Sequence, residues 1–262
     1  MTINFQLGQQ TITAEGIINL LTKYQLLPQI LRELIIDQSI AAIECTPEEV
    51  AYGSQLFCEY NQITEENTKL AWLQKYGMSH EQLDMLTARK LKIEKFKQTT
   101  WGGKLEAYFL WQKPQLDKII YSLLRTQDIE VAQELYFRIQ AKEQTFSELA
   151  RKYSDGPEAQ TDGLIGPVEL KALHPALVQI LSISKPGQLW SPVRLGDWFV
   201  IVRLEKNIPA QLDENMRQRL LNEVFEIWLS EQIQVAMEQQ NSTDYQSKIL
   251  NLISSLTTAN QI

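Results

Sequence analysis

The sequence predicts an α+β fold, in which helices precede and follow a short segment rich in strands. Helix start and stop signals recur between residues 13 and 98, and short apolar runs typical of buried strands follow between 119 and 204. Helical spacing of apolar residues then returns over 211–238. With 262 residues, 44% of them hydrophobic, the chain can bury a sizeable core, and we expect two domains.

The N-terminal part is expected to be a series of helices. Thr46-Pro47-Glu48-Glu49 combines a capping hydroxyl, a proline suited to the first turn and carboxylates at the positive end of the helix dipole. A helix is therefore predicted from there to about Tyr60. The other predicted helices of this part span residues 14–21 with a cap at Thr13, 26–43, 65–76 with a glycine cap at Gly77, 79–98 and 105–111. We expect a break over 99–103 and a helix end at Pro114.

Strand signals begin near Lys118. Residues 119–124 form a short apolar run consistent with a buried strand. Two more strands are predicted over 190–194 and 198–204, joined by a tight turn. The remaining predictions for this segment are helices over 128–140, 145–150 and 175–181, and loop and turn over 153–167, where glycine and proline gather. The long helix over 211–238 should pack back on the N-terminal helices through an apolar side made of Met216, Leu220, Val224, Ile227 and Leu229.

Composition narrows the functional classes. A net charge of −7 and a pI near 5.1 argue against a broad nucleic-acid surface, because phosphate binding depends on clustered Lys and Arg. Cys45 and Cys58 lie in no zinc or redox spacing, so we expect reduced, buried or half-buried thiols. The first residues show no export signal, and no apolar run reaches about 18 residues. A cytoplasmic protein without membrane insertion is predicted.

Four motifs, taken in order, resemble the parvulin family of peptidyl-prolyl cis-trans isomerases. Residues 145–154 (TFSELARKYS) resemble its aromatic, Glu-Leu-Ala, Tyr-Ser signature, and residues 163–166 (GLIG) resemble its Gly-x-Leu-Gly loop. Residues 185–187 (KPG) and 191–193 (SPV) resemble its late glycine turn and Pro-Val strand. The resemblance implies a small antiparallel sheet wrapped by helices, with Ile119 to Leu124 and Phe199 to Leu204 paired at its centre.

The flanking helices resemble those of foldases that surround a parvulin domain with a helical chaperone segment. The predicted organisation is a helical chaperone-like domain over 1–115, a parvulin-like domain over 116–209, a C-terminal helix over 210–240 that packs on the helical domain, and a polar tail over 241–262.

The resemblance implies rotamase activity on X-Pro bonds of proline-containing peptides or unfolded protein clients, with no cofactor or metal. Relatives place two histidines on adjacent central strands, and these positions fall on Ser122 or Leu123 and on Val200. The expected function is therefore isomerisation of weakened activity. The alternative is a non-catalytic peptide-binding chaperone or adaptor with a degenerate parvulin groove.

The candidate site residues follow from the family register. The polar residues proposed for catalysis are Asp155, Ser122 and Asp197, with Gly156 as the alternative position for the family's Cys or Asp. The proposed substrate-binding residues are Ile165, Leu170, His174, Leu177, Trp198, Phe199 and Arg125. Each also has an ordinary structural interpretation: buried leucines are usually core, an Asp in a Ser-Asp-Gly turn usually forms the turn, and an arginine is usually solvated.

Overall fold

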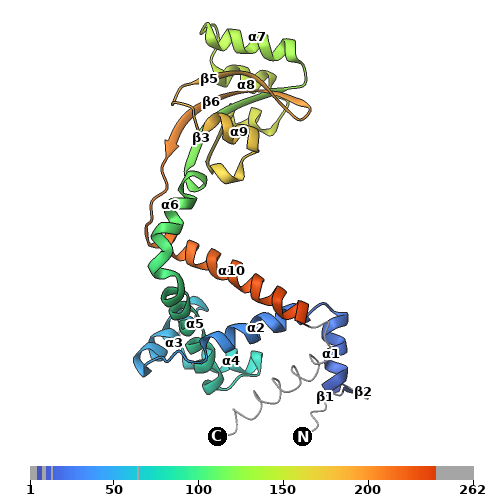
Figure 1. Cartoon of the computed structure of the whole chain (residues 1–262), viewed down its shortest axis with the longest axis vertical. Coiled ribbons are helices and arrows are strands. Elements are labelled where there is room, and N and C mark those ends of the chain that lie inside the picture. The colour runs from blue at the N-terminus through green and yellow to red at the C-terminus, as the bar shows by residue number, and fades with distance from the viewer. Residues whose placement is uncertain (1–4, 8–9, 13, 64, 240–262) are drawn as a thin grey trace. The chain divides into compact units, whose positions relative to one another are not determined.

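The computed structural model describes residues 5–7, 10–12, 14–63 and 65–239, so the predicted cap at Thr13 and the predicted tail over 241–262 lie outside the described residues. The chain forms two compact units (Figure 1). One, the helical unit, combines the N-terminal residues up to Leu105 with those from Gln218 on, and the other, the sheet unit, is Glu106–Arg217. No helix in the described part of the chain is long and apolar enough to cross a membrane.

The helical unit begins with a small antiparallel strand pair, β1 with β2. Its elements are β1 (Phe5–Leu7), β2 (Gln10–Ile12), α1 (Ala14–Lys23), α2 (Leu27–Ile40), α3 (Pro47–Tyr60), α4 (Glu66–Tyr76), α5 (His80–Trp101), the 3-10 turn Gly102–Lys104 and most of α10 (Glu214–Gln239). The predicted cap of α3 is confirmed, because the Thr46 hydroxyl accepts from the backbone N–H of Glu49. Gly77 ends α4 in the left-handed conformation, as predicted.

Two predicted helix ends were wrong. α5 continues to Trp101, because threonine and tryptophan are compatible with a helix and only the following Gly-Gly pair breaks it. Pro114 lies inside α6, which ends at Leu116. Proline has no N–H, so α6 lacks the hydrogen bond from residue 114 to the carbonyl of Leu110, and the helix still ends only two residues later, at Leu116.

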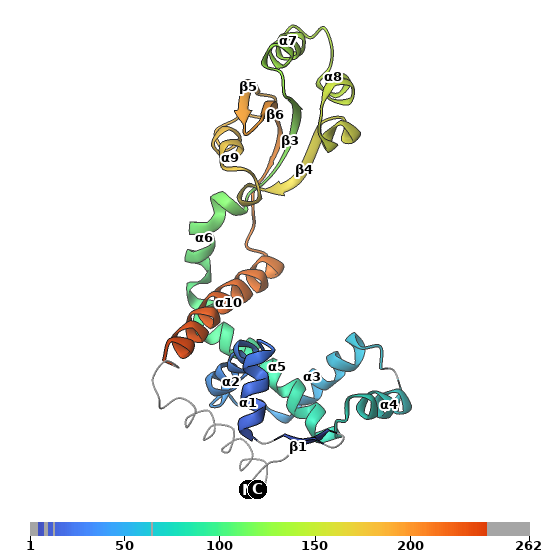
Figure 2. The ribbon, with the colours of Figure 1, turned by 90° about the vertical axis from the view of Figure 1, so that its right-hand side faces the viewer.

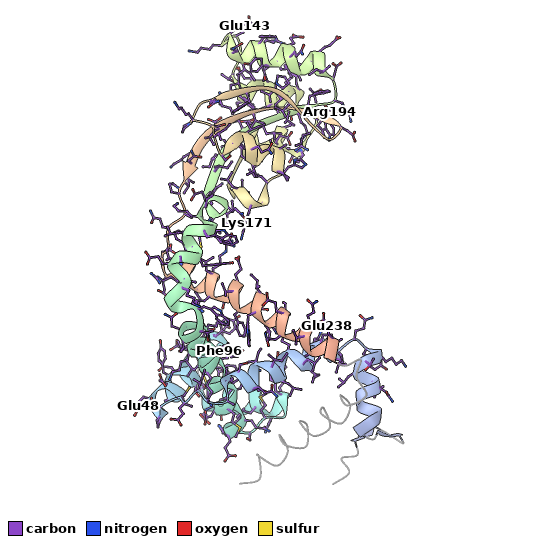
Figure 3. All side chains as sticks on the ribbon, viewed as in Figure 1. Glu48, Phe96, Glu143, Lys171, Arg194 and Glu238 are labelled. Carbon is purple, nitrogen blue, oxygen red and sulfur yellow. The ribbon has the colours of Figure 1, made fainter. Side chains whose placement is uncertain are left out.

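The return of α10 to the N-terminal helices is confirmed. Phe225 and Leu229 are buried in one cluster with Ile36 and Ile40 of α2. The Phe225 ring also meets the ring of Phe96, which Figure 3 labels on α5, with centroids 6.4 Å apart. The apolar side of α10 is therefore covered by α2 and α5.

The sheet unit holds a four-stranded antiparallel sheet in the order β4-β3-β6-β5. Its elements are α6 (Leu105–Leu116), β3 (Lys118–Thr126), α7 (Ile129–Gln140), α8 (Phe146–Tyr153), the 3-10 turn Pro157–Thr161, β4 (Leu164–Glu169), the 3-10 turn Leu170–Ala172, α9 (Pro175–Leu181), β5 (Leu189–Leu195) and β6 (Trp198–Ile208). The predicted central pairing is confirmed, because Leu124 lies opposite Ile201 and Leu123 opposite Val202.

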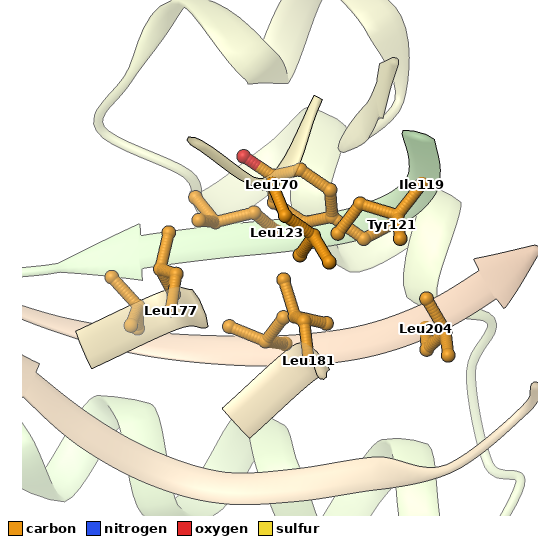
Figure 4. Packing of buried hydrophobic residues seen from close by; sticks show 9 residues of the cluster. Ile119, Tyr121, Leu123, Leu170, Leu177, Leu181 and Leu204 are labelled. Carbon is orange, nitrogen blue, oxygen red and sulfur yellow. The ribbon is translucent and has the colours of Figure 1, made fainter. Parts of the chain in front are cut away.

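Helices cover the two faces of this sheet differently (Figures 1 and 2). On the α9 face, residues of β3 and β6 form a core with α9 and the turn before it, part of which Figure 4 shows. The members of this core are Ile119, Tyr121, Leu123, Leu170, Leu177, Leu181, Val200, Val202 and Leu204. On the α7–α8 face, Leu124 and Ile201 pack with Phe146 and Leu149. Odd and even residues of β3 thus face opposite sides.

The stretch 153–167, predicted as loop and turn, is only partly so. Its last residues form β4, which pairs with β3 at the edge of the sheet. Proline is tolerated in an edge strand because one side of such a strand has no ladder to complete. Pro167 lies in β4 and Pro192 in the other outer strand, β5, and the pairing of each strand is interrupted by a register shift.

Gly163, just before β4, is expected to tolerate no side chain. Its φ is +81°, and an added Cβ would lie 2.8 Å from the Ala150 methyl and 3.0 Å from the Leu123 carbonyl oxygen. Gly163→Ala should therefore lower the free energy of unfolding by about 2–4 kcal/mol, because the cost of a left-handed backbone at alanine adds to the cost of overpacking. Gly187→Ala is the control, because its φ is +83° with open space around it. Equal losses in denaturant melts of both variants would contradict the packing argument.

Candidate functional site

The α9 face carries apolar side chains at Leu123 and Val200, two positions that the family resemblance assigns to histidines. Leu123 and Val200 are 3% and 1% exposed, and both belong to the core of this face. Of the two candidates for the first position, only Leu123 shares a face with Val200. Ser122 faces the α7–α8 side, where its hydroxyl donates to Oε1 of Glu205 at 2.5 Å. A hydrogen-bond network built on Ser122 would therefore lie on the other face of the sheet.

The two predicted aspartates lie in exposed turns. Asp155 donates its backbone N–H to the carbonyl oxygen of Arg125, and its side chain is exposed. Asp197 is exposed in the turn between β5 and β6. Ser122 faces the opposite side of the sheet from Leu123, so the structure does not bring the three proposed catalytic residues together on one face.

The predicted substrate-binding residues divide by burial and by face. Leu170 and Leu177 are 7% and 5% exposed, so they form the floor of the α9 face rather than its accessible surface. Ile165 and Trp198 are half-buried and pack against that floor. Among the predicted binding residues packed on this face, these two side chains are the ones accessible to a ligand.

Two other predicted binding residues have different roles. His174 is exposed and caps α9, because its Nδ1 accepts from the backbone N–H of Ala176 at 3.3 Å. Phe199 alternates with Trp198 and Val200 along β6 and so faces the opposite side of the sheet. Neither residue contributes its side chain to the core of the α9 face.

Arg125 forms an ion pair with Glu158, a residue that the sequence did not mark as part of the site. Its Nε and Nη2 donate to the two carboxylate oxygens of Glu158 at 2.8 and 2.7 Å. The Glu158 side chain is 1% exposed, and the Ser154 hydroxyl donates to it at 2.6 Å. The Arg125 guanidinium lies 6.0 Å from the Trp198 ring centroid. No sequence pattern marks Glu158, because its role depends on a fold that brings the turn after α8 to β3.

Tyr121 is the polar side chain within the α9 core. It is 4% exposed, and burial raises the pKa of its phenol, an effect that the Arg125 charge opposes and the Glu158 charge reinforces. The hydroxyl therefore stays protonated at neutral pH and lies within electrostatic range of the Arg125–Glu158 pair. Among the described residues, no cluster of three or more His, Cys, Asp or Glu side chains could hold a metal ion.

Comparisons with known proteins place one segment of the chain in a known family. The profile of the rotamase family, described as the PPIC-type PPIase domain, matches residues 121–206. Chaperone SurA of Colwellia psychrerythraea is 33% identical over 88 residues, which are 32% of this chain and 20% of that protein. The match thus spans about a fifth of this relative's length.

A likeness in fold extends to nearly the whole chain. A crystal structure of the peptidylprolyl isomerase PrsA from Bacillus cereus matches with a TM-score of 0.52 and 17% identity, covering 95% of this chain and 97% of that one. Because the identity is low, this match bears on fold alone. The chain therefore contains a parvulin domain of the PPIC type at residues 121–206, within a chain that shares the fold of PrsA.

Proposed function

We propose that the parvulin domain binds X-Pro segments of unfolded or flexible proteins on the α9 face and isomerises them slowly. The observation that carries this proposal is the make-up of that face. Half-buried Ile165 and Trp198 offer apolar and aromatic surface suited to a proline ring, whereas Leu123 and Val200 are apolar where relatives have imidazoles.

The chemistry needs no bond to break. Amide resonance opposes rotation of the peptide bond with a barrier of about 18–20 kcal/mol. A dry, apolar surface lowers it by binding the twisted amide, which is less polar than the planar one, better than the planar forms. Hydrogen-bond networks in dry sites lower this barrier further. Each reduction of the barrier by about 1.36 kcal/mol raises the rate about tenfold. Without the histidines, turnover should fall more than affinity.

Binding and exchange measured on one sample test the proposal. We expect an X-Pro peptide to shift the NMR signals of Ile165 and Trp198, with cis/trans exchange at least about tenfold slower than that of a histidine-bearing parvulin. Ile165→Ala should weaken binding about fivefold to tenfold, because it removes part of the apolar contact. Leu164→Ala is the matched control, since that neighbouring side chain on the same strand is 51% exposed and belongs to no core cluster.

The possible outcomes separate the two functions. Binding without any acceleration of exchange would establish the alternative, a non-catalytic peptide-binding chaperone or adaptor, which the apolar Leu123 and Val200 favour. Exchange as fast as in a histidine-bearing parvulin would refute the slow-catalyst half. Identical titrations of Ile165→Ala and Leu164→Ala would refute binding at this face.

The proposal also covers the role of the helical unit, the domain boundaries and the cellular location of the protein. The helical segments would act as a chaperone surface for the same unfolded clients. The domain boundaries would lie near residues 115 and 209, with the helix over 210–240 packed on the helical domain over 1–115. Limited proteolysis followed by mass spectrometry tests those boundaries. The cytoplasmic location predicted from the sequence is tested by cell fractionation.

A further inference from the structure

Among the described residues, the hydrogen bonds of the Arg125 guanidinium all go to one partner, the Glu158 carboxylate. Glu158 accepts from Nε and Nη2 at 2.8 and 2.7 Å, and in the described part of the chain Nη1 makes no hydrogen bond. The carboxylate is nearly inaccessible at 1% exposure, whereas the Arg125 side chain is 29% exposed. The pair therefore fixes the orientation of the guanidinium and leaves the N–H groups of Nη1 available to a ligand.

The register of the sheet places this guanidinium beside the proposed binding surface. Arg125 lies directly opposite Val200 in the β3–β6 ladder and alternates with Leu124, so it points to the α9 face. Its guanidinium lies over the Trp198 ring, with 6.0 Å from Cζ to the centroid. A peptide lying against Trp198 would meet the free edge of the guanidinium.

The ion pair also fills the space that a side chain at position 156 would need. The family's Cys or Asp falls on residue 155 or 156, and residue 156 is glycine. A Cβ added to Gly156 would overlap Nε of Arg125 and the carboxylate oxygens of Glu158. A residue with a side chain at position 156 thus could not coexist with the Arg125–Glu158 pair as it stands.

Amide rotation has a specific need that such a donor meets. In the planar amide the nitrogen lone pair is delocalised into the carbonyl, whereas in the twisted amide it is localised on nitrogen. A hydrogen bond donated to that nitrogen is therefore stronger in the transition state than in either ground state, which is the condition for catalysis. A donor to the carbonyl oxygen would instead stabilise the planar forms.

The geometry points to Arg125 as a catalytic residue that donates an Nη1 N–H to the prolyl nitrogen of the twisted amide, with Glu158 as its positioning residue. This inference rests on the proposed isomerase function. No proton is transferred and no covalent bond changes, because the guanidinium keeps its protons throughout. The Arg125–Glu158 pair thus provides the hydrogen bond to the substrate on a face that has no histidines.

Arg125→Lys is the primary test. The ammonium keeps the charge beside Glu158 but lacks the planar fork that aims Nη1. We expect the exchange rate at saturating peptide to fall at least about tenfold, while the Kd changes less than about threefold and the melting temperature stays close to that of the wild type. Arg151→Lys is the matched control, because Arg151 makes an equivalent bidentate pair with Asp162 but is 69% exposed.

An NMR titration of the wild-type chain is a second test that needs no substitution. In a titration with X-Pro peptide, the Nη1 signals of Arg125 should move while its Nε signal, bound to Glu158, stays in place. Glu158→Gln should lower the saturated rate in the same direction as Arg125→Lys. A purely structural ion pair would give neither the selective Nη1 shift nor a change in rate without a change in Kd.

The outcomes distinguish this inference from the proposed function. Peptide-dependent exchange in the wild type that persists unchanged in Arg125→Lys overturns the role of Arg125 and leaves the isomerase proposal standing. Absence of acceleration in the wild type overturns both. If Arg125→Lys does not fold, unmoved Nη1 signals in the wild-type titration are sufficient to reject the inference.

Discussion

Replacing Arg125 by methionine is expected to lower the free energy of unfolding of the sheet unit by about 3–5 kcal/mol. The substitution leaves the Glu158 carboxylate buried at 1% exposure, with the Ser154 hydroxyl as its remaining side-chain donor among the described residues. Breaking a buried pair is costly because the remaining charge has lost its compensation. Arg151→Met should lower the free energy of unfolding far less than Arg125→Met, since its pair with Asp162 is exposed to solvent.

Hydrogen exchange of the amides in β3 and β6 measures this effect separately from the helical unit. The double variant Arg125→Met with Glu158→Leu should recover much of the loss, because it removes both charges. A single Arg125→Met variant as stable as Arg151→Met would show that water reaches Glu158 in solution.

Removal of α10 should unfold the helical unit. Ending the chain after Gln211 deletes Phe225 and Leu229 from the core they share with Ile36 and Ile40. Each large buried side chain lost costs about 2–5 kcal/mol, so the total approaches the whole stability of a typical domain. The buried Lys97 ammonium would also lose its hydrogen bond to Asn222. Loss of amide protection in α2 and α5 is the expected result.

Point substitutions separate packing from simple shortening. Phe225→Ala should reproduce part of the destabilisation, at about 3–5 kcal/mol. Ile227→Ala, on the same helix but 49% exposed, should cost less than 1 kcal/mol or so. Undiminished protection of α2 in the shortened chain would refute the claim that α10 completes this core.

Features set by local chemistry were predictable from the sequence. The caps at Thr46 and Gly77 depend on residues within a few positions, and both lie where predicted. The central strands were marked by their apolar runs. By contrast, β4 begins among glycines and a proline, and it becomes a strand only because β3 provides a partner. No local signal records such a partner.

The candidate site was harder to predict for two reasons. It depends on which strand residues face which side of the sheet, and on contacts between residues far apart in the sequence. A shift of one residue moves a side chain to the other face of a sheet, which is why Ser122 and Leu123 were equivalent in the sequence and opposite in the structure. Glu158 is separated from Arg125 by 33 positions. Its burial beside the guanidinium comes from the path of the chain after α8.

The prolines of the outer strands bear on the proposed binding of unfolded chains. An extended peptide can extend a sheet only along a regular row of free N–H and C=O groups. β4 and β5 each have a proline, which lacks an N–H, and an interrupted register with the neighbouring strand. Both rims of the sheet are thereby poor templates for strand addition. For the proposed function among unfolded chains, this would keep the domain from adding strands to their aggregates and would leave the side chains of the α9 face as the surface for contact.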